Sequence, residues 1–407
     1  MPLVRLRDMP ASLHSILITA GDVSGDVHTA ALARAMLARN PGLALHTLGG
    51  ARLQAVAAES HGGQILGDTT NCSAIGIISA IKVYFRCWKL RAQMRRFLDA
   101  HHVDAAVLCD WGAFNGRILR ELYARGIPVL YYFPPRSWQR SGTSGLGIVP
   151  YVTRVATPFE WSAQRLQAAG CRAEWVGHPS VEKVRLPEER AALRLRFDVQ
   201  PEEKLVALMP GSRRSEIKIL APKMAQTAAL INAKRSVRFI AVLPHELGAE
   251  ARSYLPPSIP IVLDCATDLL RAADAAIVKT GTASLEAVLA GTPQVAVYDF
   301  SVAGRIEWFL LWAWKRIPFY AMPNIILQRE VVPELLGPKC QPERIAGQLI
   351  RLLDDGPARR QMLQDYELIR HALGSELPVP ATERTAQILE EMLQATKGYT
   401  AAVAAAV

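Results

Sequence analysis

The stretch that decides the fold reads Ala275-Ala276-Ile277-Val278-Lys279-Thr280-Gly281-Thr282-Ala283-Ser284-Leu285-Glu286. An apolar run with the character of a buried strand leads into small hydroxyl and glycine residues, and a helical pattern follows. Such a loop directs backbone N–H groups and a helix N-terminus at an anion, and a diphosphate suits it best. Glu286 falls about one helical turn further on, where its carboxylate can accept hydrogen bonds from a ribose. The stretch predicts a nucleotide site with Gly281, Thr282 and Glu286 as contacts.

A second loop of this kind follows the apolar strand expected at residues 205–209. It reads Pro210-Gly211-Ser212-Arg213-Arg214-Ser215-Glu216 and combines backbone amides with arginine. Ligands of open parallel sheets bind outside the carboxyl ends of the strands, so two such loops indicate one nucleotide site. Gly211, Ser212 and Arg213 are the contacts that this second loop is expected to supply.

The chain of 407 residues is longer than one hydrophobic core usually organises, so two domains are expected. Apolar strands alternate with helical segments in both halves, which predicts parallel sheets with helices on both faces. This alternation of strands and helices is interrupted at residues 177–179 and in the charged segment that follows them. We therefore expect a first domain at residues 1–178 and a second at residues 179–375. Residues 376–407 are expected to form a helix that packs back on the first domain, followed by a frayed tail.

Lysine and arginine outnumber the acidic residues and give a formal net charge of +10. General solubility accounts for such a charge, but so does an anionic partner, either a phosphate-bearing substrate or an acidic membrane surface. No nucleic-acid-binding signature is present, so no nucleic-acid partner is expected. Six cysteines without a C-x-x-C pair argue against a disulfide framework or a zinc site, and a reducing cytoplasm fits better. We recognise neither a signal peptide nor an apolar stretch of the roughly 20 residues that span a bilayer.

Polar residues follow the first two strands expected in the first domain. The loop at residues 21–26 lacks the G-x-G-x-x-G pattern of dinucleotide sites, so it is either a tight turn with Asp26 near a helix start or a loop that contacts substrate. Asp110 is a candidate general base and Asn115 a candidate substrate ligand, although capping or a turn, taken alone, explains both residues better. His178 is a candidate phosphate or sugar contact at the expected hinge, with a structural role as the alternative.

Two segments combine aromatic with basic residues. Residues 301–323 include Trp308, Trp312 and Trp314 beside arginine and lysine, and residues 82–89 have the same character. Packing in a core would explain the aromatic residues. The alternative is an interfacial element that brings a lipid substrate to the site, since amphipathic aromatic and basic side chains favour the membrane surface. This alternative predicts peripheral contact with an anionic membrane.

Several short motifs occur in an order and spacing that is specific as a set, although each is weak alone. They are Gly21 to Asp26, Gly76-Ile77, Pro158-Phe159-Glu160, Gly177-His178-Pro179, Pro210 to Arg213, Gly281 to Glu286 and Pro323 to Glu330. With them, residues 14–395 resemble the lipid-A-disaccharide synthase family. The resemblance implies an α/β fold of the GT-B class, in which two Rossmann-like domains have parallel sheets that face one another across a cleft.

The resemblance also implies an inverting glycosyltransferase that is peripheral on the cytoplasmic face of the inner membrane. Such an enzyme moves the acylated sugar of UDP-2,3-diacylglucosamine to the 6-hydroxyl of 2,3-diacylglucosamine 1-phosphate, forms a β-1,6 bond and releases UDP. By similarity, Asn324, Gln328 and Glu330 also line the nucleotide side. No cofactor and no metal are expected, because arginine and a helix dipole account for stabilisation of the departing diphosphate.

The chain departs from the family's pattern in the first domain. Residues 110–115 replace Asp-Ala-Pro-Asp-Phe-Asn, so the second aspartate, often considered the catalytic base, is Ala113 here. Asp22 replaces a glutamate, and residues 133–139 differ from Ser-Pro-Ser-Val-Trp-Ala-Trp. Because the nucleotide-side motifs are nearly intact, UDP-sugar binding is expected to persist, while the general base remains open among Asp110, Asp22 and Asp26. Two alternatives follow: a related UDP-sugar glycosyltransferase with another acceptor, and a non-catalytic paralogue that binds UDP-sugar or lipid.

Overall fold

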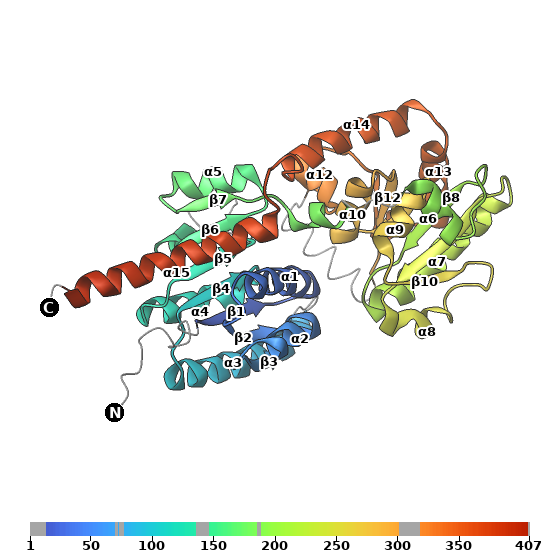
Figure 1. Ribbon diagram of the computed structural model, residues 1–407. Coiled ribbons are helices and arrows are strands. Elements are labelled where there is room, and N and C mark those ends of the chain that lie inside the picture. The colour runs from blue at the N-terminus through green and yellow to red at the C-terminus, as the bar shows by residue number, and fades with distance from the viewer. Residues whose placement is uncertain are drawn as a thin grey trace, which may run out of the picture. The chain divides into compact units, whose positions relative to one another are not determined.

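The computed structural model describes residues 14–69, 72, 77–135, 146–184, 189–300 and 318–405. Contacts between Cα atoms divide the chain into two units, one formed by Met1–Pro179 with Glu376–Val407 and the other by Ser180–Ser375. The predicted boundary, after residue 178, lies one residue before this division. Each unit contains one sheet with helices on both of its faces (Figure 1).

The first unit has a seven-stranded sheet in the order β3-β2-β1-β4-β5-β6-β7, and every pairing in it is parallel. The central strands are buried on both faces, which explains their continuous apolar runs. The strands are β1 (Ser15–Ala20), β2 (Ala44–Gly49), β3 (Gln64–Asp68), β4 (Ala105–Cys109), β5 (Val129–Tyr132), β6 (Arg154–Thr157) and β7 (Ala173–Trp175). The helices between them are α1 (Val23–Arg39), α2 (Ala51–Glu59), α3 (Ile77–Ala100), α4 (Gly112–Ala124) and α5 (Glu160–Ala168).

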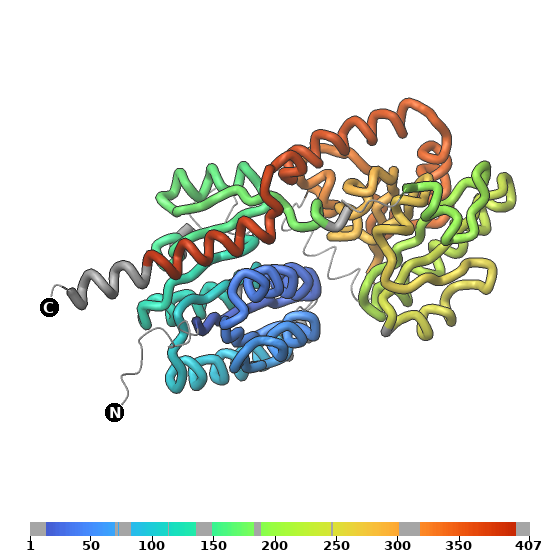
Figure 2. The backbone as a smooth tube through the Cα atoms, in the orientation of Figure 1, coloured from blue at the N-terminus to red at the C-terminus, as the bar shows by residue number. Residues whose placement is uncertain are grey.

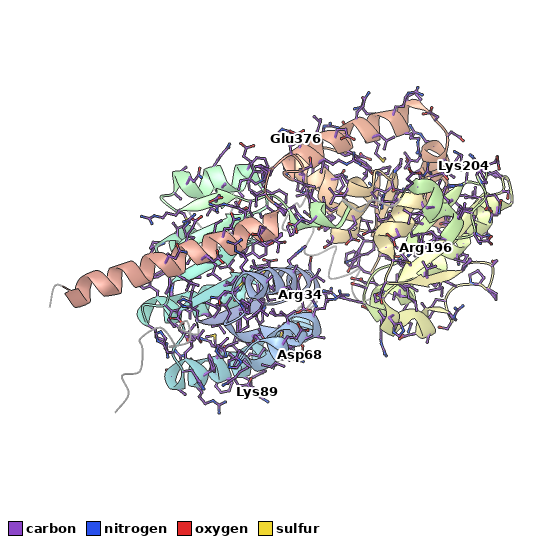
Figure 3. The ribbon with its side chains drawn as sticks, viewed as in Figure 1. Arg34, Asp68, Lys89, Arg196, Lys204 and Glu376 are labelled. Carbon is purple, nitrogen blue, oxygen red and sulfur yellow. The ribbon has the colours of Figure 1, made fainter. Side chains whose placement is uncertain are left out.

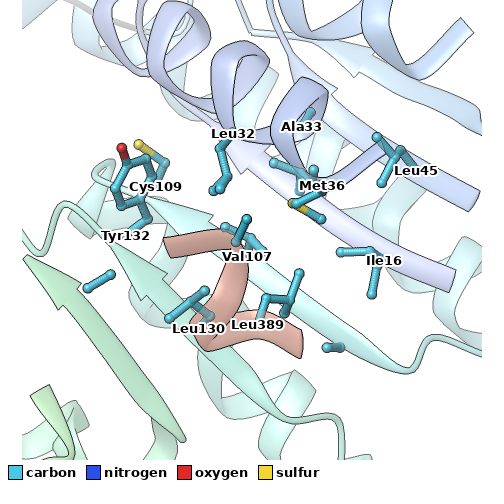
Figure 4. Packing of buried hydrophobic residues seen from close by; sticks show 14 of the residues in the cluster. Ile16, Leu32, Ala33, Met36, Leu45, Val107, Cys109, Leu130, Tyr132 and Leu389 are labelled. Carbon is cyan, nitrogen blue, oxygen red and sulfur yellow. The ribbon is translucent and has the colours of Figure 1, made fainter. Parts of the chain in front are cut away.

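The last helix, α15 (Ala381–Ala405), belongs to the first unit although it follows the second in sequence. The tube in Figure 2 follows the chain from α14 (Pro357–Ala372) into this helix. Leu389 packs in the same cluster as Ile16, Val107 and Leu130 from the sheet (Figure 4). Arg39 at the end of α1 adds ion pairs to Glu383 and Glu390, the latter at 2.6 Å. The expected return of a C-terminal helix to the first domain is therefore confirmed.

Two separate cores cover the two faces of the first sheet. One contains α1, α2 and α15 with the side chains of Ile16 and Ile18, and the other contains α3 and α4 with that of Leu17. Alternate residues of β1 thus point to opposite faces, as the pleat of a strand requires. α3 and α4 therefore share a face of the sheet that α1 does not reach.

The second unit has a six-stranded parallel sheet in the order β10-β9-β8-β11-β12-β13. Its strands are β8 (Leu205–Met209), β9 (Arg238–Leu243), β10 (Ile261–Leu263), β11 (Ala275–Lys279), β12 (Gln294–Tyr298) and β13 (Glu334–Leu336). The helices are α6 (Arg190–Arg196), α7 (Arg214–Asn232), α8 (Gly248–Ala251), α9 (Ala266–Ala272), α10 (Thr282–Ala290), α12 (Met322–Leu327), α13 (Pro342–Leu353) and α14 (Pro357–Ala372). The apolar strands β8 and β11, which the sequence analysis singled out, are neighbours at the centre of this sheet.

Candidate active site

The two predicted anion-binding loops of the second unit lie at adjacent strand ends. β8 and β11 are parallel neighbours, with Met209 paired to Val278 at their carboxyl ends. The loop after β8 contains Gly211 with a φ of +123°, and the loop after β11 contains Gly281 with a φ of +120°. Only glycine adopts such angles without strain, so both loops depend on it. The fold thus brings together the two loops that the sequence pattern assigns to one nucleotide site.

A buried carboxylate joins these loops. Glu216, in the first turn of α7, accepts a hydrogen bond from the Ser212 N–H at 3.2 Å and lies 3.0 Å from the Nζ of Lys279. The Nη1 of Arg213 lies 3.8 Å from the same carboxylate. A Cβ on Gly211 would lie 2.4 Å from Glu216 Oε2, so this glycine also makes room for the carboxylate. One buried negative charge therefore orders two cations and one backbone amide at the strand ends.

Neither Glu216 nor Lys279 was predicted from the sequence to be a site residue. The sequence does contain a sign of Lys279, which is the only charged residue of β11 and lies at the end of this otherwise apolar strand. An ammonium group beside buried strands needs a partner of opposite charge. The Nζ of Lys279 also lies 5.7 Å from the centre of the Tyr298 ring, at the end of the neighbouring strand β12. Burial, aided by the charge of Glu216, raises the pKa of the Tyr298 hydroxyl. Ion pair and ring contact together hold Lys279 beside the loop.

The N-terminus of α10 follows Gly281 directly. The Ser284 hydroxyl donates to the Gly281 carbonyl at 2.6 Å and accepts from the Met322 N–H at 3.1 Å, which links the start of α10 to α12. Thr282 is the first residue of α10 and is exposed, and Glu286 lies half-buried one turn further along. The positive end of the helix dipole therefore lies at the end of β11, where it favours an anion.

Asn324, in α12, holds the segment that follows this helix. Its Nδ2 donates to the Val332 carbonyl and to Glu334 Oε1, both at 2.9 Å. Its Oδ1 accepts from the N–H groups of Val331 and Val332 at 2.8 and 2.9 Å. These four bonds use the full capacity of an amide side chain. The geometry therefore favours a positioning role for Asn324, and its contact with a nucleotide stays a prediction.

Gln328 and Glu330, the other residues expected on the nucleotide side, are exposed in the turn after α12. Gln328 ends that helix in the left-handed conformation, with a φ of +54°, and its Nε2 donates to the Ile325 carbonyl. Between them, Arg329 forms two hydrogen bonds to Asp365 of α14 at 2.7 and 2.8 Å. This paired contact anchors the turn and leaves both expected residues accessible to a ligand.

In the first unit, Asp110 lies on a strained turn between β4 and α4. Asp110 has a φ of +40° and Trp111 a φ of +48°, and Phe133 at the end of the neighbouring strand has a φ of +56°. Residues other than glycine rarely adopt this region, and such strain concentrates at functional sites. The Trp111 ring stacks on Phe114 with centroids 3.8 Å apart, and a Cβ on Gly21 would lie 2.1 Å from it. The close fit of these groups maintains the turn.

Two buried side chains hold the backbone of Asp110. The Nδ2 of Asn115 donates to the carbonyls of Asp110 and Cys109 at 2.8 and 3.1 Å, and its Oδ1 accepts from the Thr19 hydroxyl at 2.9 Å. The Tyr131 hydroxyl also donates to the Asp110 carbonyl. These contacts tie β1, β4 and β5 around the turn. Asn115 thus has the turn-stabilising role that its position alone favours.

Asp110 lies beside Asp22 at the carboxyl ends of β4 and β1. The residue as a whole is exposed, but the protein around its carboxyl removes part of its hydration. This loss of hydration, together with the negative charge of Asp22, raises the pKa of Asp110 to about 6, against the opposing effect of a hydrogen bond from the Trp111 backbone. A carboxylate of this pKa is largely ionised at neutral pH and is a better proton acceptor than an ordinary one.

The other two candidate bases serve helix starts. Asp22 is the N-cap of α1, where its Oδ1 accepts from the Gly25 N–H at 2.6 Å. Asp26 is buried, and its two oxygens accept from the N–H groups of Arg52 and Leu53 at 3.1 Å, in the first turn of α2. The geometry favours a helix-capping role for Asp26, because each of its oxygens accepts a hydrogen bond from a backbone N–H of α2. The sequence predicts a helix start near Asp26, and the structure shows that the helix it caps is α2.

Replacing Asn115 by alanine is expected to lower the free energy of unfolding by about 1–3 kcal/mol, because buried hydrogen-bonding groups lose their partner. Urea unfolding followed by circular dichroism measures this change. Asn40→Ala is the matched control, since Asn40 is half-buried and its side chain accepts one hydrogen bond, from the Gly42 N–H at 3.1 Å. An equal loss in both variants would contradict the role assigned to Asn115.

Parts of the predicted site lie outside the described residues. They include residues 301–317 with Trp308, Trp312 and Trp314, and residues 136–139. Ala113 lies in the first turn of α4, but its side chain is outside the described part. His178 is buried against Phe133 and His28, with ring centroids at 5.3 and 5.5 Å and the rings nearly perpendicular. These contacts favour the structural role that was the alternative for His178.

In the portions of the chain that the structure describes, no three histidine, cysteine, aspartate or glutamate residues gather closely enough to hold a metal ion. No helix formed by the described residues is both long and apolar enough to cross a membrane. No disulfide links any of the six cysteines, all of which are described.

Known proteins resemble this chain over nearly all of its length. Residues 16–389 match the family model described as lipid-A-disaccharide synthetase. The lipid-A-disaccharide synthase of Myxococcus xanthus is 33% identical over 386 residues, which cover 93% of this chain and 97% of the relative. That of Prochlorococcus marinus is 31% identical, with coverage of 94% and 99%.

Solved structures share the fold at lower identity. The UDP co-structure of S. aureus MnaA aligns with a TM-score of 0.60 at 13% identity, covering 94% of this chain and 97% of that one. Acinetobacter baumannii MurG aligns with a TM-score of 0.52 at 15% identity, with coverage of 93% and 99%. These matches confirm the GT-B fold class with its two Rossmann-like units. The family model and the relatives, matched over almost the whole chain, show that it belongs to the lipid-A-disaccharide synthase family.

Proposed function

We propose that this chain transfers the 2,3-diacylglucosaminyl group of UDP-2,3-diacylglucosamine to 2,3-diacylglucosamine 1-phosphate. The products are UDP and the β-1,6 lipid A disaccharide 1-phosphate. Family membership over residues 16–389 carries the choice of reaction. The adjacent loops after β8 and β11 support the donor half of the proposal, and the strained turn at Asp110 supports the acceptor half.

The donor half rests on charge and backbone geometry. Arg213 and the N-terminus of α10 would bind the diphosphate, and Glu286 would accept hydrogen bonds from the ribose. During transfer, negative charge develops on the β-phosphate as its bond to C1 of the sugar breaks. Positive groups that are already ordered by Glu216 need no rearrangement to stabilise that charge. The second unit would therefore bind the donor and stabilise the leaving UDP.

The acceptor half needs a base for one hydroxyl. In the proposed step, the Asp110 carboxylate takes the proton of the 6-hydroxyl while that oxygen attacks C1 of the donor sugar. The C1–O bond to the diphosphate breaks with its electron pair going to UDP, and the configuration at C1 inverts. A single in-line displacement requires only this base and a stabilised leaving group. Asp110 would thereby compensate for Ala113 at the position of the family's aspartate.

Ala113 also motivates the second candidate function, a UDP-sugar transferase with another acceptor or a non-catalytic binding protein. The proposed reaction and this second candidate are distinguished by an assay of the purified protein with both acylated sugars in detergent. The assay measures UDP release and identifies the lipid product by mass spectrometry. Formation of the disaccharide phosphate is the expected result. Binding of UDP without turnover on this pair would overturn the proposed reaction and favour the second candidate.

The pH dependence of turnover tests the base directly. Because the pKa of Asp110 is raised to about 6, the ionised and active form predominates above that pH and is lost below it. Turnover is expected to be level near neutral pH and to fall about tenfold per pH unit below about pH 6. Initial rates of UDP release in overlapping buffers, at saturating substrates, measure this profile. Constant turnover down to about pH 5 would contradict Asp110 as the base.

We also propose that the protein binds peripherally to the cytoplasmic face of an anionic inner membrane. Three aromatic side chains of α3 support this, since Tyr84, Phe85 and Trp88 are 56%, 60% and 62% exposed. They alternate with Arg86 and Lys89, and exposed aromatic and basic residues on one helix suit the interface of a bilayer. Contact at this helix would give the enzyme access to its acylated substrates.

A further inference from the structure

A groove rich in arginine lies between α3 and α4 in the first unit. Its volume is about 460 Å³, and it is lined by Arg91, Arg95, Gly116, Arg117, Arg120, Glu121, Ala124 and Arg125. The lining residues thus include five arginines and only one acidic residue, Glu121. A concave site dominated by one sign of charge attracts ligands of the opposite sign. The lining therefore selects an anion.

The single carboxylate orders part of the groove. Glu121 is only 7% exposed, and it forms an ion pair with Arg91 and a hydrogen bond from the Nε of Arg95 at 2.8 Å. A buried carboxylate between two guanidinium groups fixes both in place and neutralises one of their charges. Arg125, at the end of α4, is paired with Asp99 outside the groove. The lining keeps an excess of positive charge after these contacts.

Aromatic rings support the remaining two arginines. The Cζ of Arg117 lies 5.9 Å from the centre of the Tyr84 ring, and that of Arg120 lies 5.8 Å from the centre of the Tyr151 ring. Such contacts restrain a guanidinium group without consuming its N–H donors. Arg117 and Arg120 therefore present donors whose planar arrangement matches the oxygens of a phosphate.

The groove continues the exposed aromatic surface of α3. Tyr84, Trp88, Arg91 and Arg95 are spaced by four, three and four residues, so they follow one face of the helix. Figure 3 shows Lys89 on the outer side of the same helix. Aromatic side chains give way to arginines along this face, as they would if the rings entered the lipid interface and the cations met headgroups.

We propose that the groove between α3 and α4 binds the phosphodiester headgroup of an anionic membrane phospholipid. The proposal deepens the membrane contact of the proposed function by assigning it a site and a ligand. It differs from the acceptor site, because α4 begins beside Asp110 at the end of β4 and the groove lies further along the helix, from Gly116 to Arg125. The arginines would thus hold the protein to the lipid surface without contacting the reacting sugars.

The test measures binding of the full-length protein to vesicles by sedimentation. Vesicles of phosphatidylcholine are compared with vesicles that also contain phosphatidylglycerol. Arg117→Gln and Arg120→Gln are each expected to lower the affinity for the anionic vesicles about fivefold, since each basic residue near such a surface contributes to binding. Arg34→Gln is the matched control, because Arg34 is exposed on α1, over the opposite face of the sheet (Figure 3). It is expected to change affinity much less.

Equal losses in Arg34→Gln and the groove variants would overturn the proposal, since net charge alone would then explain binding. It would also be overturned if glycerophosphate or heparin bound at the groove while anionic vesicles did not. UDP release in detergent is measured on the same variants and is expected to be unchanged. Because vesicle binding does not depend on turnover, failure of the proposed reaction and failure of the groove remain distinguishable.

Discussion

Asp110→Asn is expected to lower the turnover number for UDP release by about 10²- to 10⁴-fold, the usual contribution of a general base. The amide has nearly the same shape as the carboxylate but cannot take the proton of the acceptor hydroxyl. The strained turn should persist, because Asn115 and Tyr131 bind the backbone carbonyl of Asp110 rather than its side chain. The dissociation constant for UDP should also stay unchanged, since the predicted nucleotide contacts all belong to the second unit.

Asp22→Asn is the control for this variant. Asparagine is as good an N-cap as aspartate, so α1 should keep its start. The substitution removes the negative charge that helps to raise the pKa of Asp110, so the acidic limb of the pH profile should move to lower pH. Turnover lost in Asp22→Asn but retained in Asp110→Asn would reverse the assignment of the base.

The fold could be predicted from the sequence for those strands that are buried on both faces and are therefore made of apolar residues. β8 and β11 are apolar because helices cover both of their faces, and their runs are visible in the chain. β2 and β3, by contrast, contain no continuous apolar run. β2 contains His46 and Thr47, which are buried in the sheet, and most of β3 lies at an exposed edge. Polar residues within a strand interrupt the apolar pattern by which a buried strand is recognised.

The loops of the candidate site could be predicted from the sequence, but the contacts between its side chains could not. The positions of glycine revealed where the backbone turns, and both Gly211 and Gly281 have the positive φ that such turns require. Local sequence did not reveal that Asp26 caps α2, or that Glu216 pairs with Lys279 from another strand. Asp26 lies 26 and 27 residues from its two partners, and Glu216 lies 63 residues from Lys279, so only the fold brings them together. Contacts between side chains that are far apart in the sequence could therefore be identified only from the structure.

Arg213→Ala is expected to weaken UDP binding by about 10- to 150-fold, which corresponds to the roughly 1.5–3 kcal/mol of a hydrogen bond to a charged group. Arg213 precedes α7 at the end of β8, and its side chain is 38% exposed, so a diphosphate can reach it. The fold should tolerate the change, since Lys279 and the Ser212 N–H still contact the Glu216 carboxylate. Isothermal titration calorimetry with UDP measures the effect.

Arg214→Ala is the matched control, because it removes the same charge from the next position in the chain. Arg214 is 74% exposed and pairs with Glu250 at 3.1 Å, away from the carboxylate that joins the two loops. Its loss should change the affinity for UDP less than about threefold, as expected for an exposed ion pair. Raising the salt concentration should weaken UDP binding less in Arg213→Ala than in Arg214→Ala, because the former has already lost the direct charge contact. Similar affinities in the two variants would mean that the diphosphate is bound by backbone amides alone, and Arg213 would then have no direct role.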